Sequence, residues 1–292
     1  MTHSHTSQAN RLLGYPGNGR LLIINADDFG RSHASNVATL RALTQGVVSS
    51  TTLMVPCPWA LHAMQLLAEH PEVSFGVHLT VVCEVSHYRC APLTSRDNVA
   101  SLVDASGFFY TIDQIPQWLA QVQLPELEAE FRAQIEAVLA ASLTPTHLDW
   151  HCLYNGGRAD IFELTVQLAQ EYGLAMRVFD RSTGEALQRQ GLPTNDHDVL
   201  DSYSLGLDDK AAWYVRALRD LPSGLSEWAV HPALDTPEMQ AIEPESWQVR
   251  TTDFAFLISQ EARQIIKQEG IVLLSYKPLQ EVWQTQVRQR TS

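Results

Sequence analysis

The segment LLIINADDFG, residues 21–30, ends an apolar run with two adjacent carboxylates, Asp27 and Asp28. Two ionised carboxylates side by side repel each other, and neither is stable in an apolar interior without a compensating positive charge. The pair therefore indicates chemistry if other polar residues converge on it.

The segment THLDWH, residues 146–151, supplies further candidates. Side chains alternate along a strand, so His147, Asp149 and His151 share one face, while Leu148 and Trp150 take the other. Two imidazoles and a carboxylate suit a divalent cation; nitrogen ligands favour zinc and oxygen ligands favour magnesium. For this strand alone, a buried, hydrogen-bonded His–Asp pair is the alternative.

Two more histidines end apolar runs, His78 in FGVHLT and His231 in EWAVH. By alternation Glu227 shares a face with His231 and could hold its imidazole in one tautomer; an interior or surface carboxylate is the alternative. DDFG also contains the Asp-Phe-Gly that binds magnesium in protein kinases. The glycine-rich loop, strand lysine and His-Arg-Asp loop of kinases are missing, which argues against that class.

Seven short apolar runs predict the strands that position these residues. Nearly continuous Val, Ile and Leu are typical of parallel strands covered on both faces, and helix-like segments separate the runs. This alternation predicts a parallel α/β fold, either a (β/α) barrel or an open doubly wound sheet. The polar candidates fall at the carboxyl ends of four strands, where such folds build active sites. The predicted strands are residues 21–26, 50–55, 73–79, 146–151, 175–179, 227–231 and 271–276.

The chain of 292 residues, 45% hydrophobic, predicts one large domain over residues 20–292 after a flexible tail of residues 1–19. Residues 84–116 are too long for an ordinary loop and predict an insertion that forms a lid or a substrate wall. The polar segment 180–209 could do the same.

A formal net charge of −13 argues against nucleic-acid binding and against docking on anionic membranes. Four scattered cysteines predict reduced thiols in a cytoplasmic protein. The first twenty residues lack the apolar core of a signal peptide, and no stretch reaches the roughly 18 apolar residues of a membrane helix. A homodimer is expected only from the prevalence of two-fold oligomers.

The motifs NADDFG, GVHLT, THLDWH, EWAVHPA and RTTDFAFL followed by GIVLLSY occur in this order between residues 20 and 278. Together they resemble the YdjC-like carbohydrate deacetylases. The resemblance implies an irregular, TIM-barrel-like (β/α) barrel with fewer than eight strands, here seven parallel ones. It also implies one divalent metal ion, Mg²⁺ or Zn²⁺, and removal of acetyl groups from a small acetylated sugar such as a chitooligosaccharide.

Carried onto this sequence, the resemblance makes Asp28, His78 and His151 the metal ligands, Asp27 the general base and His231 the general acid. A water molecule activated by the metal would attack the amide carbon.

Many members of that family continue the fourth-strand motif with further histidines, whereas this chain reads HCLYNGG. Tyr154, Trp150 and Asn155 are the candidates for substrate contact, with His147 and Asp149 in supporting positions. An aromatic side chain is more often part of a core than a sugar platform.

Two other functions compete with the deacetylase. A metal-dependent phosphoesterase or other amidohydrolase also uses Asp and His at barrel strand ends, and a second metal held by His147 and Asp149 would favour it. A non-catalytic sugar-binding relative is the third possibility, but all five proposed chemical residues are present.

Overall fold

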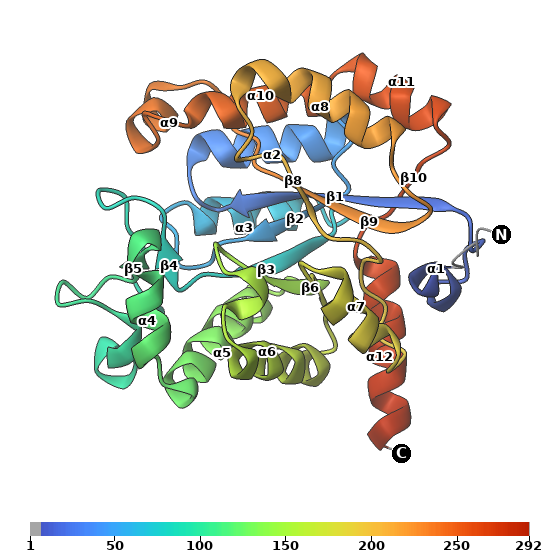
Figure 1. Ribbon diagram of the computed structural model, residues 1–292. Coiled ribbons are helices and arrows are strands. Elements are labelled where there is room, and N and C mark those ends of the chain that lie inside the picture. Colours follow the sequence, from blue (N-terminus) through green and yellow to red (C-terminus); the bar gives the residue numbers. More distant parts are fainter. Residues whose placement is uncertain (1–6, 292) are drawn as a thin grey trace.

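The computed structural model describes residues 7–291 and shows a curled parallel sheet surrounded by helices (Figure 1). The strands follow the order β7-β6-β3-β2-β1-β9-β8, and β10 pairs with the beginning of β1. A separate pair, β4 and β5, lies at the edge of the fold. The strands are β1 (Arg20–Phe29), β2 (Ser50–Leu53), β3 (Phe75–Leu79), β4 (Val82–Cys83), β5 (Tyr110–Thr111), β6 (His147–Trp150), β7 (Ala175–Met176), β8 (Leu200–Asp201), β9 (Gly224–Val230) and β10 (Val272–Leu273).

The predicted irregular barrel is confirmed, and each of the seven predicted strands overlaps an observed one. The two outer strands of the path, β7 and β8, approach each other where the amide of Val199 donates to the carbonyl of Phe179 at 3.0 Å. The eighth strand of the sheet, β8, lies inside the polar segment 180–209. This strand was missed because Leu200 is half-buried, Asp201 is exposed, and the two residues form no apolar run.

In Figure 1 helices α2, α8, α10 and α11 lie above the curled sheet, on the side of β1, and α5, α6, α7 and α12 lie below it, on the side of β3 and β6. The outward residues Leu22 and Ile24 of β1 share one buried cluster with Leu218 of α8 and Leu257 of α10. The helices are α1 (Gln8–Leu12), α2 (His33–Gln45), α3 (Ala60–Glu69), α4 (Ile115–Gln121), α5 (Leu124–Ala140), α6 (Ala159–Tyr172), α7 (Arg181–Gln188), α8 (Leu207–Arg219), α9 (Pro237–Ile242), α10 (Trp247–Leu257), α11 (Gln260–Gln268) and α12 (Lys277–Thr291).

Strand alternation sorts apolar residues toward the helices and polar residues into the barrel. On β6, Trp150 faces α6, where its indole N–H donates to Thr165 at 3.2 Å. The neighbouring Asp149 faces inward and contacts His78 and Arg177. The shared inward face predicted for the polar residues of this strand is therefore present.

Two peripheral segments bear on the sequence predictions. Residues 7–19 are not a free tail, because the Ser7 hydroxyl and the Ala9 amide donate to Asp196 at 2.6 and 3.3 Å and α1 contacts β9 and α7. Residues 1–6 of the expected tail lie outside the described part. The segment 84–116 holds β5, three short 3₁₀ turns and the start of α4.

Within residues 7–291, no helix combines the length and the apolar character needed to cross a membrane.

Candidate active site

The carboxyl end of β1 is distorted so that both adjacent aspartates reach the same cavity. Asp28 has a φ of 67°, in the left-handed region that an L-residue other than glycine rarely adopts. The pairing of β1 with β2 shifts register between Ala26 and Phe29. A regular strand would send Asp27 and Asp28 to opposite faces. The distortion instead leaves both carboxylates on the cavity wall.

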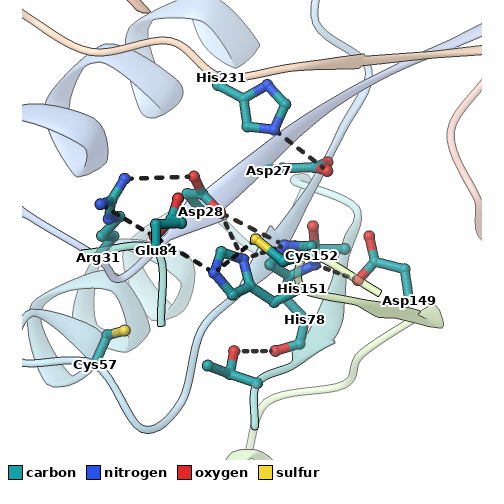
Figure 2. A network of polar contacts seen from close by, with 12 residues as sticks. Asp27, Asp28, Arg31, Cys57, His78, Glu84, Asp149, His151, Cys152 and His231 are labelled. Atoms are coloured by element: carbon teal, nitrogen blue, oxygen red, sulfur yellow. Dashed lines mark hydrogen bonds and ion pairs between the residues drawn. The ribbon is translucent and has the colours of Figure 1, made fainter. Parts of the chain in front are cut away.

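Asp28, His78 and His151 converge from the ends of β1, β3 and β6 (Figure 2). The Asp28 Oδ1 atom lies 3.5 Å from His78 Nε2 and 3.3 Å from His151 Nδ1, and these two nitrogens are 3.3 Å apart. All three residues are at most 2% exposed. Two imidazole nitrogens and a carboxylate oxygen thus surround one point, as a divalent cation requires.

Each imidazole also turns its other nitrogen toward a second carboxylate. Asp149 Oδ1 lies 2.7 Å from His78 Nδ1, and Glu84 Oε2 lies 3.4 Å from His151 Nε2. Such carboxylate–histidine pairs fix the ring orientation and the tautomer of metal-binding histidines. In this arrangement Nε2 of His78 and Nδ1 of His151 are the nitrogens that would face a cation.

Arg177 holds the neighbouring carboxylate, Asp27. Its two terminal nitrogens donate to the two oxygens of Asp27 at 2.7 Å, and it also forms ion pairs with Asp149 and Glu227 at 2.7 Å. Burial alone would raise the pKa of Asp27, but the charge and hydrogen bonds of Arg177 outweigh it and hold that pKa well below its usual range. Asp27 is therefore an ionised carboxylate with a fixed orientation.

Arg250 of α10 balances the charge of Asp28. Its Nη1 lies 2.7 Å from Asp28 Oδ2, and its other nitrogens contact Glu84 and Glu243. Burial would raise the pKa of Asp28, but Arg250 and the two imidazoles lower it far below its usual value. Arg31 also forms ion pairs with Glu84 and Glu243, the two carboxylates that Arg250 contacts besides Asp28. Asp28 is thus ionised and could serve as a ligand for a cation.

His231, directly after β9, lies on the opposite side of Asp27 from the imidazole pair (Figure 2). Its Nε2 is 3.9 Å from Asp27 Oδ2, and its ring meets Tyr203 edge-on at 5.0 Å. Asp253 accepts a hydrogen bond from its backbone amide at 3.0 Å. Its Nδ1 is buried and has no hydrogen-bond partner among the described residues. His231 can therefore exchange protons with a group bound beside Asp27.

These groups open into a cavity of about 560 Å³, within the range of small-molecule sites. Val85, Ile112 and Ile115 form one wall, so the predicted insertion does border the site. Leu153, Tyr154, Phe179 and Ala229 add apolar surface.

Comparison with known proteins gives the family of the chain. Residues 21–268 match the model of the family described as YdjC-like protein. The chain belongs to the YdjC-like family. Carbohydrate deacetylases of Brevibacillus brevis and Geobacillus stearothermophilus are each 31% identical to it, over 88% of this chain and 99% and 97% of theirs.

A solved structure agrees with the fold of this YdjC-like chain. It is an Enterococcus faecalis protein described as a cellobiose-phosphate cleavage protein. It superposes with a TM-score of 0.77 at 28% identity, over 89% of this chain and 99% of that one.

The residues present in this YdjC-like site fit a divalent metal ion. The Asp28 Oδ1 atom is buried and accepts no hydrogen bond from any described residue, although it faces two imidazole nitrogens. An unsatisfied buried carboxylate oxygen is costly unless a cation or a donor completes it. Asp28, His78 and His151 would hold the ion.

The three residues predicted to contact the substrate of this YdjC-like chain lie at different depths relative to the cavity. Tyr154 is 60% exposed at the cavity rim, tilted against Phe179 with ring centroids 5.3 Å apart. Trp150 borders the cavity but is 1% exposed and packs on α6. Asn155 holds a loop, because its amide donates to Asp180 and accepts from the Phe179 backbone. A substrate contact by any of the three stays a prediction.

Two supporting residues lie deeper in the barrel. His147 stacks on Tyr276 with ring centroids 3.6 Å apart. Glu227 binds Arg177 and accepts a hydrogen bond from Tyr276. Of the two interpretations of Glu227, the structure agrees with the interior carboxylate: Glu227 is 1% exposed, and it reaches His231 only indirectly, through Arg177 and Asp27.

Sequence reasoning missed Arg177, Arg250 and Glu84. An arginine inside the apolar run AMRVF was a usable signal for Arg177, because a buried guanidinium must face carboxylates. Arg250 begins the RTTDFAFL motif, which carried the family resemblance without a role for this residue. Glu84 opens the long insertion, and nothing in its sequence context shows that it turns back toward β6.

Proposed function

We propose that this protein is a metal-dependent carbohydrate deacetylase that removes an acetyl group from a small N-acetylated sugar. The observation that carries the proposal is the meeting of Asp28, His78 and His151 beside Asp27 and His231 in one cavity. The family and the carbohydrate deacetylases among its relatives support it.

The bound ion would lower the pKa of water and polarise the acetamide carbonyl. Asp27 is placed to take the proton of the attacking water, and Arg177 and Asn25 hold its carboxylate in position. Because Arg177 disfavours the protonated form of Asp27, that carboxyl gives up the proton readily. His231 then delivers a proton to the departing nitrogen, which cannot leave as an anion.

The cavity suits a neutral sugar. Among the described residues that line it there is no lysine or arginine, while Glu84, Asp201 and Glu243 are acidic. Tyr154 and Phe179 offer aromatic surface at the rim, against which the apolar face of a sugar ring can pack. We therefore propose a small chitooligosaccharide or a related acetamido sugar without a phosphate group.

The contacts disfavour the phosphoesterase alternative. A second ion at Asp149 would have to displace Arg177 from one carboxylate oxygen and His78 from the other. His147 is stacked on Tyr276 rather than turned toward Asp149. Zn²⁺ and Mg²⁺ both remain candidate cofactors, and a homodimer and a cytoplasmic location stay predictions from the sequence.

The test is acetate release by chelated protein, with and without added Zn²⁺ or Mg²⁺. The substrates are N,N′-diacetylchitobiose, its 6-phosphate and a panel of monomeric acetamido sugars. We expect metal-dependent release, with the neutral disaccharide preferred over the phosphorylated one. No release from any sugar by protein carrying one ion per chain would contradict the proposal, and phosphate release from a phosphoester would favour the alternative.

A further inference from the structure

Three of the four cysteines lie together outside the proposed reaction. Cys57, Cys83 and Cys90 are each buried, with at most 6% of their surface exposed, and none lines the catalytic cavity. The Sγ atoms of Cys57 and Cys90 are in contact at 2.6 Å, although 33 residues separate them in the chain. Figure 2 draws Cys57 beside the site, but it joins none of the dashed contacts there.

We propose that Cys57 and Cys90 form a reversible disulfide bond that fastens the wall of the cavity to the turn after β2. The oxidant is a small-molecule disulfide. One cysteine thiolate attacks it and releases one small thiol; the other cysteine then attacks the mixed disulfide and releases the second. Two protein thiols are oxidised, one external disulfide is reduced to two thiols, and the protein's two thiol protons are transferred to those products. The inference is independent of the proposed reaction.

The neighbours of each cysteine favour this pair over the others. Cys83 accepts a hydrogen bond from the backbone amide of Cys90 at 3.2 Å, so its sulfur faces the main chain. Cys152 lies apart, with its sulfur 3.3 Å from His151. Contact with Cys57 raises the pKa of the Cys90 thiol well above its usual value. The thiol is therefore protonated at neutral pH, and we expect exchange to be slow.

The bond would join two segments that shape the active site. Cys57 belongs to the turn after β2, where the amide of Trp59 donates to the carbonyl of Gly30 at the end of β1. Cys90 lies six residues after Glu84, and its carbonyl accepts from the amide of Phe109 across the insertion. A covalent link between them would restrict how far the segment that carries Glu84 can move away from the cavity.

The experiment equilibrates the folded full-length protein in glutathione buffers from reducing to oxidising, followed by acid quenching, denaturation and alkylation of free thiols. Arg89 separates Cys90 from Cys83, and Glu69 and Glu72 separate Cys83 from Cys57. Digestion with trypsin and a glutamate-specific protease therefore places each of the three cysteines in its own peptide for mass spectrometry. Hydrogen exchange of residues 84–111 is measured on both forms.

We expect loss of two alkylatable thiols under oxidising conditions, one peptide linked through Cys57 and Cys90, and slower amide exchange over residues 84–111. The Cys83→Ser variant should still form the link, and Cys90→Ser should not; if Cys90→Ser fails to fold, the wild-type peptide map decides. Four alkylated cysteines in every buffer, or a link between any other pair, would overturn the proposal. Unchanged exchange in the linked form would overturn its claimed effect on the wall.

Discussion

Replacing Asp27 with asparagine separates proton transfer from metal binding. The amide side chain has almost the same shape as the carboxylate and keeps one oxygen for Arg177, whose other partners Asp149 and Glu227 remain. Asp28 and the two histidines are unchanged. General-base catalysis is typically worth about 10²–10⁴-fold, so kcat should fall by that factor, or about 3–5 kcal/mol in the activation barrier. Metal content should stay near one ion per chain.

The stability of the same variant can be bounded from its contacts. Removing a buried partner of an ion pair costs about 3–5 kcal/mol. The Asp27→Asn substitution removes the charge but retains an acceptor, so we expect a smaller loss of about 1–3 kcal/mol. Acetate release, bound metal and urea unfolding are compared with wild type and with Asp235→Asn, an exposed aspartate outside the cavity. Wild-type turnover by Asp27→Asn, or loss of its metal, would refute the assignment of Asp27 as the base.

Other changes give distinct results. Glu84→Gln should weaken metal binding about 10–100-fold while excess metal restores turnover, because Glu84 orients His151; unchanged affinity in a metal titration would contradict that role. Tyr154→Ala should raise KM up to about tenfold with little change in kcat, and Tyr154→Phe should not; equal KM values for all three proteins would exclude a sugar contact. Arg177→Met should lower the free energy of unfolding by about 3–5 kcal/mol or more, since it removes the cation that three buried carboxylates share, and urea denaturation showing wild-type stability would refute this.

The sequence was sufficient for seven strands of the sheet and for the placement of the polar residues at their ends. Alternation along THLDWH predicts which side chains point inward, and Asp149 lies on that face, next to His78. The parallel fold then brings the ends of β1, β3, β6 and β9 to one side of the sheet. This reasoning depends only on local period and chain order, and the structure agrees with it.

The charges that stabilise the site could not be predicted in the same way. Arg177 and Arg250 lie 150 and 222 positions from the aspartates they bind, and no local pattern specifies those pairs. The sequence does not predict the left-handed conformation of Asp28 either, because an aspartate does not signal a left-handed backbone. Because Arg177 was not recognised in the sequence, its position between Glu227 and the Asp27–His231 pair was not predicted either.

The most direct test of the account is the position of the metal itself, measured by anomalous scattering from crystals of the protein loaded with Zn²⁺. We predict one strong peak per chain at about 2.0–2.2 Å from an Asp28 oxygen, His78 Nε2 and His151 Nδ1. A peak bound instead by Glu84, His151 Nε2 and Cys152, or no peak near Asp28 in protein that turns over, would contradict the central claim.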